Sequence, residues 1–452
     1  MKKFITVTLI LFVLLLGLSA CSDAEKPSAK NPVILTMWHV YGSQTQSPLN
    51  DAIDEFNSTV GKENGITINV VSVTSSSAID KALSASANNE PGAEELPDLF
   101  TAYPRVVEIV GEDSLLPWDN FFTADELAPF KDEFLSEGYF NDTLLMLPLA
   151  KSSEAFFLNK TLFDKFSAET GVSIDTLATF DGLFATAKQY YDWSGGLNFT
   201  QINDYYNYAL IGMHAYGSNF VQDGQLQLEN PTFEKIWTPL AEAAIHGGIC
   251  LDDGYAAARW KTVEIISNVG SSADILYQPE VVYYPDNTSI PILTVSLPYP
   301  TFADAQPTVV HRGGGLFATK SSDSRKNYAA YIFAKWITAK ENNLRFVTNT
   351  GYLPVTDDAF AILFRDTGIV ENESYRNLYG TLGTMLDSYE LCSLPLYEDS
   401  SETQLNFEQN VKLVLRSAHH RYLERVENGE NPGSVLRELT AASLEDLKKL
   451  SY

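Results

Sequence analysis

The sequence predicts an α/β protein with more than one domain. The chain has 452 residues, of which 45% are hydrophobic, so it can form two or more hydrophobic cores. Residues 33–103 alternate apolar strand-like segments with amphipathic helical segments. The last third is dominated by apolar residues at helical spacing. Together these three observations favour sheets that are flanked by helices.

The first alternation begins with a strand at 33–38 and a helix at 47–59. Ser47 is a good N-cap for this helix, and Pro48 suits its first position. The pattern then gives a strand at 65–73, a helix at 77–89 and a strand at 97–103. A β-α-β-α-β order of this kind favours a mostly parallel sheet.

The middle of the chain is less regular. Residues 144–166 contain a strand that breaks at Pro148 and resumes at 154–159 before a further helical pattern. Helices are predicted at 176–191, which begins near Thr179 or Asp181, and at 230–248. Residues 261–277 indicate a strand, a Gly-Ser turn and a new helix, and 278–310 indicate strands and loops.

The segment "HRGGGLFATK" (311–320) leads into a strand rather than a helix. A long helical stretch follows at 324–350, with Ala329, Phe333 and Ile337 on its apolar face. Gly351 can cap that stretch and Pro354 prevents its continuation. The remaining chain is mostly helical and includes 410–429.

The N-terminus has the pattern of an export signal. Two lysines precede an apolar run at 4–17, which is short for a spanning helix. "LSAC" (18–21) has the pattern of a lipobox, so we expect lipid attachment and cleavage at Cys21. An ordinary signal peptide that is cut near Ala20 is the alternative. Residues 22–32 are polar and predict a flexible tether.

Charge and cysteine content exclude some protein classes. The formal charge of −27 disfavours a nucleic-acid binder, which needs a positive surface. Apart from Cys21 the chain has only Cys250 and Cys392, which is no disulfide framework. These two thiols either pair with each other or stay free.

No catalytic or cofactor motif is present. The six histidines form no H-E-x-x-H pair, and the chain has no C-x-x-C and no G-x-S-x-G. Gly313–Gly315 lack the remaining residues of a P-loop, so close packing or a turn is the simplest explanation for them. We therefore expect no cofactor, no metal and no enzyme. A glycosidase, which needs only two carboxylates, is the alternative.

Several stretches, taken in order, resemble one family. They include "LTMWHVYG", "LPLAKSSEAFFLNKTLF", "GGGLFATKSSDSRKNYAAYIFAKWITAKENNLRFVTNTGYLPV" and "ENGENPGSVLREL". Together they cover about 33–445 and are similar to the extracellular solute-binding proteins of bacterial ABC importers. The subgroup that binds sugars and glycerol 3-phosphate is the most similar.

This resemblance implies a type II fold of two α/β lobes that are joined by a hinge and close on a ligand. The expected N-terminal lobe comprises 33–150 and 312–355, and the expected C-terminal lobe comprises 151–311 and 356–452. The implied protein is a monomer that is anchored on the outer face of the cytoplasmic membrane and delivers its ligand to permease subunits.

The resemblance also implies a set of ligand contacts. Aromatic residues would stack on a sugar, serines would hydrogen-bond to it, a glycine would let the backbone approach it, and an arginine would meet a charged group. The candidates are Trp38, His39, Tyr41, Ser153, Tyr206, Ser272, Gly314, Tyr352 and Arg416. For each of them the alternative is a structural role, such as core packing, a turn, a helix cap or a solvated charge.

Two departures from the family bear on the ligand. The glycerol 3-phosphate binder has a tyrosine where this chain has Ile79, and a glutamate where it has Pro104. Their loss favours a mono- or oligosaccharide. Glycerol 3-phosphate or a glycerophosphodiester, whose phosphate Arg416 and the backbone near Gly314 would meet, stays the alternative. An adhesin without a small ligand is a further one.

Overall fold

The computed structural model describes residues 26–41, 47–73, 76–395, 397 and 399–452. The signal segment and Cys21 lie outside this range, so lipidation stays a prediction. The chain forms two compact units. Unit 1 comprises the described residues up to Leu149 with Gly314–Phe346 and Val355–Asp357, and unit 2 comprises Ala150–Gly313, Val347–Pro354 and Asp358–Tyr452.

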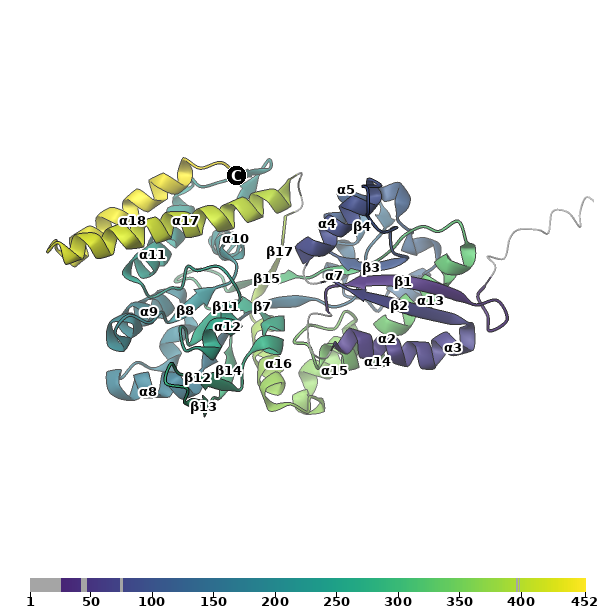
Figure 1. Cartoon of the computed structure of the whole chain (residues 1–452), viewed down its shortest axis with the longest axis horizontal. Helices are drawn as coiled ribbons and strands as arrows, with labels where there is room; N and C mark the ends of the chain where they lie inside the picture. The colour runs from purple at the N-terminus through teal and green to yellow at the C-terminus, as the bar shows by residue number, and fades with distance from the viewer. Residues whose placement is uncertain (1–25, 42–46, 74–75, 396, 398) are drawn as a thin grey trace, which may run out of the picture. The chain divides into compact units, whose positions relative to one another are not determined.

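Unit 1 is built around a five-stranded sheet of order β2-β1-β3-β16-β6 (Figure 1). Strand β1 pairs in parallel with β2 and β3, whereas β16 runs antiparallel to β3 and to β6. The elements of unit 1 are β1 (Val33–His39), α2 (Pro48–Ser58), α3 (Val60–Asn64), β2 (Ile66–Ser72), α4 (Ser76–Ala87), β3 (Leu99–Ala102), α5 (Val106–Val110), η1 (Glu112–Ser114), η2 (Trp118–Asn120), α6 (Ala124–Leu127), α7 (Asp132–Ser136), β4 (Tyr139–Phe140), β5 (Thr143–Leu144), β6 (Leu147–Pro148), β16 (Gly315–Ala318), α13 (Ser324–Thr338) and α14 (Lys340–Val347).

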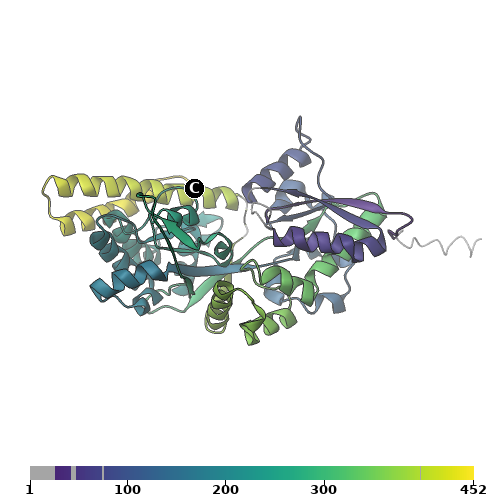
Figure 2. The same cartoon turned by 60° about the horizontal axis from the view of Figure 1, so that its bottom comes forward.

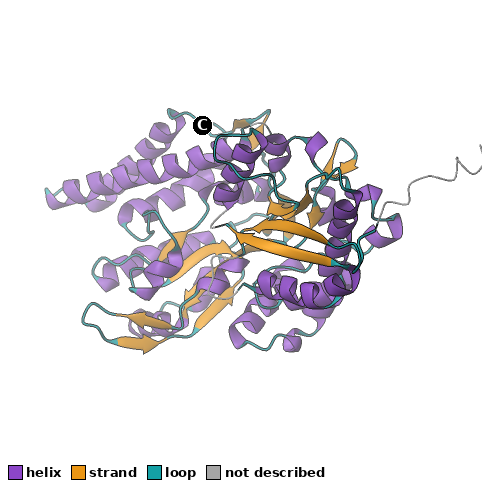
Figure 3. Ribbon diagram, turned by 45° about the vertical axis from the view of Figure 1, so that its right-hand side comes forward, coloured by secondary structure: helices purple, strands orange, loops and turns teal. Residues whose placement is uncertain are grey.

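Helices cover both faces of the unit 1 sheet (Figure 3). On one face Trp38, Phe100 and Phe317 pack with α4 and α5 in a single apolar cluster. On the other face α2 packs against α13, where the rings of Phe56 and Phe333 meet edge to face at 5.2 Å between centroids. The predicted cap of α2 is confirmed, because the Ser47 side chain accepts a hydrogen bond from the Asn50 amide.

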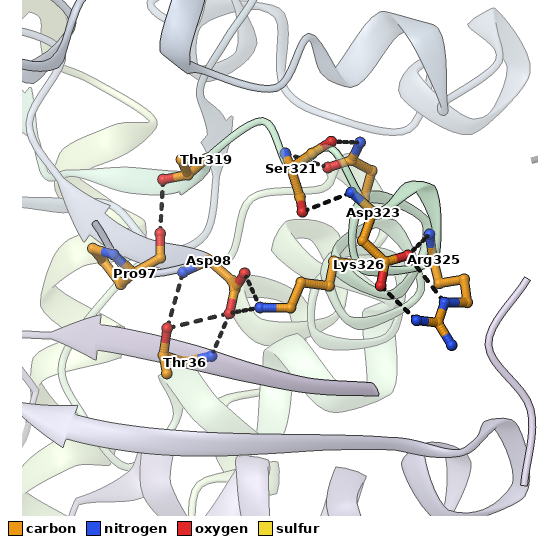
Figure 4. A network of polar contacts seen from close by, with 9 residues as sticks. Thr36, Pro97, Asp98, Thr319, Ser321, Asp323, Arg325 and Lys326 are labelled. Atoms are coloured by element: carbon orange, nitrogen blue, oxygen red, sulfur yellow. Dashed lines mark hydrogen bonds and ion pairs between the residues drawn. The ribbon is translucent and has the colours of Figure 1, made fainter. Parts of the chain in front are cut away.

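A polar network ties the strands of unit 1 to α13, on the side of β3 where that strand begins (Figure 4). Asp98 accepts hydrogen bonds from the Thr36 amide at 2.9 Å and the Thr36 hydroxyl at 3.2 Å, and forms an ion pair with Lys326 at 2.8 Å. One carboxylate thus joins β1, the start of β3 and α13. Three segments that are far apart in sequence are thereby fixed at the end of the sheet that carries none of the candidate residues.

Unit 2 has a sheet of order β17-β15-β7-β11-β8, with β14 also paired to β7. Strand pairs β15–β17 and β8–β11 are parallel, and the three pairings of β7 are antiparallel. The elements of unit 2 are β7 (Ser152–Asn159), α8 (Lys160–Thr170), η3 (Ile174–Ala178), α9 (Phe180–Ser194), β8 (Thr200–Ile202), α10 (Tyr205–Ala215), β9 (Val221–Gln222), β10 (Gln225–Leu226), α11 (Pro231–His246), α12 (Ala256–Lys261), β11 (Ser267–Ser271), η4 (Ser272–Tyr277), β12 (Val281–Tyr283), β13 (Ser289–Pro291), β14 (Thr294–Leu297), β15 (Thr308–Arg312), α15 (Asp357–Arg365), η5 (Thr367–Ile369), α16 (Glu373–Leu386), β17 (Glu390–Ser393), α17 (Ser400–Glu427) and α18 (Pro432–Lys448).

Helices α17 and α18 form a hairpin in which the two helices lie side by side (Figures 1 and 2). Helix α17 is 28 residues long, and its buried face packs on α10 and α11. This packing places Glu408, in the first half of α17, beside the start of α10. Cys250 and Cys392 are buried free thiols in unit 2.

The structure corrects three details of the sequence-based assignment. The helical stretch 324–350 is two helices, which are separated at Ala339. The helix expected after the Gly-Ser turn is the short 3-10 helix η4. Residues 347–354, which we expected in the N-terminal lobe, group with unit 2, as do Ala150 and residues 312–313, whereas residues 356–357, which we expected in the C-terminal lobe, group with unit 1.

The reason for the last correction is a set of hydrogen bonds at the start of β7. The Lys151 amide donates to the Leu353 carbonyl at 3.2 Å, and the Leu353 amide donates in return to the Lys151 carbonyl at 2.5 Å. The buried Lys151 side chain donates to the Gly313 carbonyl at 3.0 Å. Lys151 therefore joins three of the segments at which the chain passes between the two units: the start of β7, Gly313 and Leu353.

Candidate functional site

The register of the unit 2 sheet gathers polar side chains at one edge. Ser271 at the end of β11 lies opposite Glu154, Val269 lies beside Ile202 near the end of β8, and His311 on β15 lies opposite Ser153. The carboxyl ends of three strands and the start of β7 therefore share one edge, where α/β proteins bind ligands. We call this group the polar edge of unit 2; it comprises Ser152, Ser153, Glu154, Asn203, Asp204, Ser271, Ser272, Asp274 and Arg312.

Arg312 is the centre of the polar edge. Its guanidinium lies 3.0 Å from the Glu154 carboxylate and 2.9 Å from the Asp204 carboxylate. Glu154 is 2% exposed and also accepts a hydrogen bond from the Asn207 side chain at 2.8 Å. Burial raises the pKa of Glu154, although the Arg312 charge opposes this rise. Arg312 thus holds a buried carboxylate and a partly exposed one on either side of it.

A further carboxylate reaches the polar edge from α17. The Glu408 side chain accepts a hydrogen bond from the Tyr206 amide at 2.6 Å and hydrogen-bonds to Asp204. Burial and the Asp204 charge raise the pKa of Glu408 well above its ordinary value. Two carboxyl groups hydrogen-bond by sharing a proton, so Glu408 and Asp204 form one acidic pair.

The outer surface of the polar edge is formed by Asn203 and Asp274. The exposed Asn203 side chain donates to the Asp274 carboxylate at 2.7 Å. This pair lies over Gly270, where a Cβ atom would be 2.4 Å from the Asp274 oxygen. Burial raises the pKa of Asp274 to about 7, with Arg312 opposing and Glu154 adding to the rise. The result is a surface of planar amide and carboxyl groups.

The structure brings Ser153 and Ser272 together. Both are fully buried, and the Ser153 amide donates to the Ser272 hydroxyl oxygen at 3.3 Å. The Ser153 hydroxyl donates to the Val310 carbonyl at 3.0 Å. The cap of η4 is Ser271, whose side chain accepts from the Ala273 amide. The two predicted serines thus lie beneath the polar edge and bind protein groups.

Tyr206 lies in the core of unit 2 behind the polar edge. It is 1% exposed, and its ring packs edge to face on Phe220 at 5.2 Å. Its hydroxyl lies 3.3 Å from the hydroxyl of Tyr397. Tyr352, by contrast, is partly exposed on the turn that follows Gly351. Its backbone carbonyl accepts a hydrogen bond from Tyr379 at 2.9 Å.

Arg416 is engaged in contacts with the loop before α12. Its guanidinium donates to the Leu251 carbonyl at 2.9 Å and to the Asp253 carboxylate at 3.0 Å. Lys412 binds the same carboxylate at 3.3 Å. These partners join α17 to the segment after α11 and give Arg416 a structural role in addition to any ligand contact.

Trp38, His39 and Tyr41 are all buried in unit 1. Trp38 belongs to the apolar cluster below α4 and α5. Tyr41 packs edge to face on Phe346 at 5.5 Å. His39 is 0% exposed; its Nε2 lies 2.8 Å from the Asn50 amide oxygen, and its Nδ1 accepts from the Tyr41 amide at 3.1 Å. These partners require a neutral ring with its proton on Nε2.

Buried His39 predicts an acid-sensitive unit 1. Burial lowers its pKa to about 4, whereas an unfolded histidine titrates near 6.5. Below pH 6.5 the unfolded state gains a proton that the folded state does not bind, so stability falls as the pH falls. Between pH 7 and pH 5 the loss is about 2 kcal/mol. Denaturant titrations should show that His39→Gln removes this part of the pH dependence.

The matched control for this prediction is His420→Gln, because His420 is an exposed histidine on α17. We expect that replacement to leave the difference between pH 7 and pH 5 as it is in the parent protein. A His39→Gln variant that keeps the full pH dependence would show that another group is responsible for it.

The carboxyl ends of the unit 1 strands carry a smaller polar group. Arg105, two residues after Tyr103, forms an ion pair with Asp80 of α4 at 2.7 Å and lies over the Tyr103 ring at 5.0 Å. Gly314 lies at the same edge, since a Cβ there would be 2.4 Å from the Ala102 carbonyl. A Cβ on Gly315 would meet Met146 at 2.4 Å. Gly314 and Gly315 thus allow β16 to fit between β3 and β6.

Sequence reasoning missed most charged residues of these edges. Glu154, Asp204, Asp274 and Glu408 come from four separate segments and belong to no common motif. Arg312 stands next to the glycines in the sequence, but the sequence does not show that it pairs with Glu154 and Asp204. One usable signal existed: each of Asn203–Asp204 and Arg312 directly ends a predicted or short strand, where ligand-binding side chains collect.

A family model matches most of the chain. It is that of the bacterial extracellular solute-binding protein, and it matches residues 51–371. The chain belongs to this family. A comparison of this sequence with curated proteins found no match.

Solved structures show the same two-lobe fold. They include the cyclic α-maltosyl-1,6-maltose binding protein from Arthrobacter globiformis, with 18% identity, a TM-score of 0.64, and coverage of 93% of this chain and 100% of that one. An ABC substrate-binding protein from Listeria monocytogenes, in complex with cycloalternan, has 14% identity, a TM-score of 0.67, and coverage of 92% and 99%. UgpB from Mycobacterium tuberculosis, in complex with glycerophosphocholine, has 16% identity, a TM-score of 0.66, and the same coverage.

The described residues contain neither a membrane-spanning helix nor a cluster of metal-binding side chains. Within them, no helix of the solute-binding protein has the length and apolar character to cross a membrane. The same residues contain no group of three or more His, Cys, Asp or Glu side chains placed to hold a metal ion.

Proposed function

We propose that this protein is the solute-binding component of an ABC importer and that its ligand is a mono- or oligosaccharide. Membership of the solute-binding family supports the importer. The observation that carries the ligand class is the surface of the polar edge. Asn203, Asp204 and Asp274 present planar amide and carboxyl groups that can donate to and accept from neighbouring hydroxyls of a sugar.

The proposed mechanism is binding without chemistry. The two lobes close on the sugar about the segments that Lys151 fastens, and the closed form delivers it to permease subunits. The protein acts as a monomer, and the lipid on Cys21 holds it at the outer face of the cytoplasmic membrane. Structurally similar proteins were solved in complex with maltose and with maltotetraose, and this supports a carbohydrate as the ligand.

One neighbour favours a second candidate. UgpB was solved with glycerophosphocholine, which is a glycerophosphodiester. A ligand of that class would need a positive group for its phosphate, and Arg416 or Arg312 would have to supply it. The choice between the two candidates is open to direct measurement.

A thermal-shift screen of residues 22–452 tests the proposal. A ligand that binds only the folded protein raises the unfolding midpoint. We expect at least one sugar to raise it among mono- and oligosaccharides, glycerol phosphates and peptides. The importer proposal fails if no small solute raises the midpoint, and turnover of a glycan by the fragment would favour an enzyme instead.

Tyr352 is the proposed stacking residue for the sugar. Its backbone amide donates to the Thr350 hydroxyl at 3.3 Å, its carbonyl accepts from Tyr379, and alanine keeps both backbone groups. We therefore expect Tyr352→Ala to weaken binding of the best sugar at least ~10-fold while the unfolding midpoint of the free protein changes little. Calorimetric titration measures the affinity.

The matched control for this variant is Tyr283→Ala, since Tyr283 is 55% exposed on strand β12. It removes an exposed tyrosine ring from a different part of unit 2 and should leave the affinity unchanged. An unchanged affinity in Tyr352→Ala would remove Tyr352 from the site.

A further inference from the structure

Arg312 and Lys151 at the polar edge of unit 2, and Arg416 on α17, are already engaged with protein groups. Arg312 is held between Glu154 and Asp204 at 3.0 and 2.9 Å. Lys151 is fully buried and donates to the Gly313 carbonyl. Arg416 binds Asp253 and the Leu251 carbonyl. An anionic group that entered here would have to compete with a carboxylate or a carbonyl for each of them.

Acidic groups outnumber basic ones at the same edge. Glu154, Asp204 and Asp274 lie around Arg312, and Glu408 lies beside Asp204. The basic groups are Arg312, Lys151 beneath the strands, and Lys412 near Glu408. Asn203 is exposed at this edge, and Asp204 and Asp274 are partly exposed, with 26% of the Asp204 side chain accessible. An anion at this surface would place lone pairs against carboxyl oxygens, whereas a hydroxyl can donate to the same oxygens.

We propose that the polar edge selects solutes that carry hydroxyl groups and no anionic group, and that Arg312 is a structural cation which positions Glu154 and Asp204 instead of anchoring a phosphate or carboxylate. This inference rests on the proposed function and narrows its ligand class. It decides against the glycerol phosphate alternative, since both arginines that would meet a phosphate are already held by carboxylates.

Coulomb's law gives the expected ratio of the affinities for a neutral and an anionic solute. A unit negative charge about 6 Å from one uncompensated carboxylate, at the effective dielectric constant of about 20 found near protein surfaces, binds about 100-fold more weakly than a neutral group. Shared protons and salt reduce the effect, so we expect a difference between ~10-fold and ~100-fold at low ionic strength, and a smaller one at high salt.

Matched pairs of alditol and aldonate test the inference. Maltitol and maltobionate, cellobiitol and cellobionate, and lactitol and lactobionate differ only in a CH₂OH group that becomes a carboxylate. The affinity of each is measured by calorimetry on residues 22–452, together with glycerol and glycerol 3-phosphate. We expect each neutral member that binds to do so at least ~10-fold more tightly than its anionic partner.

Two variants assign the effect to the polar edge. Asp204→Asn with Asp274→Asn keeps the shape of both side chains and, at pH 8, where Asp274 with its pKa of about 7 is largely ionised, removes two charges, so the difference within each pair should shrink to less than ~3-fold. The single variant Asp274→Asn, which leaves Arg312 paired, should shrink it partly and serves if the double variant does not fold. Asp286→Asn is the control, because Asp286 lies in the exposed turn between β12 and β13 and bonds to Thr288.

The outcomes separate the inference from the function beneath it. An anionic member that binds as tightly as its neutral partner, or more tightly, overturns the inference and leaves solute binding intact. If the double variant still binds the neutral members more tightly than the anionic ones, Asp204 and Asp274 do not cause the difference in affinity. That result also overturns the inference. If neither these probes nor any solute of the thermal-shift screen binds, the proposed function fails, and the inference fails with it.

Discussion

Arg312→Met is expected to lower the free energy of unfolding by about 3 kcal/mol at pH 8. The variant leaves Glu154, which is 2% exposed, without the charge that compensates it. Removal of one partner from a buried ion pair typically costs 3 to 5 kcal/mol, and the proton that Glu154 can accept reduces that cost. Denaturant unfolding that is followed by tryptophan fluorescence measures the change.

Arg312→Met should lose less unfolding free energy at acidic pH. Burial raises the pKa of Glu154 and Arg312 opposes that rise, so loss of Arg312 raises this pKa further. A folded pKa above the unfolded one means that stability falls as the pH rises between the two values. The loss should therefore be smaller at pH 5 than at pH 8.

Two comparisons show whether the buried charge causes the loss. Lys160→Met breaks the exposed pair with Asp164, which is 2.6 Å long, and should change stability by less than ~0.5 kcal/mol. Arg312→Met combined with Glu154→Gln removes both charges and should regain at least ~1 kcal/mol relative to the single variant. A double variant no more stable than Arg312→Met would contradict the explanation.

Gly351→Ala is expected to lower the free energy of unfolding by about 3 kcal/mol. Gly351 has a φ of 77°, and a Cβ would lie 2.4 Å from the Ser272 carbonyl and 2.6 Å from Ile275. The left-handed backbone alone disfavours alanine by about 1 kcal/mol, and the overlap with fixed backbone adds about 2 kcal/mol. The turn that carries Tyr352 must shift away from η4 to relieve it.

Gly171 provides a closely matched control. It caps α8 with the same φ of 77°, but a Cβ there would meet nothing within 4 Å. Gly171→Ala should therefore show only the backbone effect, about 1 kcal/mol. The difference between the two variants measures how closely the turn packs on Ser272. Equal losses would mean that the turn is free to move.

Local patterns were sufficient for most elements of the fold. The cap at Ser47 with Pro48 after it fixes the start of α2, and Thr179 likewise caps α9. The residues that make up each of these signals lie within four positions of one another, so the signals can be recognised from the sequence alone. The transfer of 347–354 to unit 2 depends on contacts with distant residues, such as Lys151 with Leu353, and no local pattern reports it.

For the glycines at 313–315 as well, the sequence predicted one part of their role and the structure was needed for the other. Their sequence excluded a P-loop, because a strand follows them. It did not reveal what requires glycine at each position. Gly313 has a φ of 133°, Gly314 lies against the Ala102 carbonyl, and Gly315 lies against Met146. These are three separate requirements, and partners that are far away in the chain impose them.

The sequence by itself determined the α/β class, the order of the elements and the resemblance to solute-binding proteins, because these follow from apolar spacing, capping residues and stretches of matching order. Only the tertiary structure decided the charge of the polar edge. The register of β7, β8, β11 and β15 places Arg312 beside Glu154 and Asp204, and the packing of α17 adds Glu408. Arg312 directly precedes three glycines in the sequence, and the folded chain pairs it with two carboxylates.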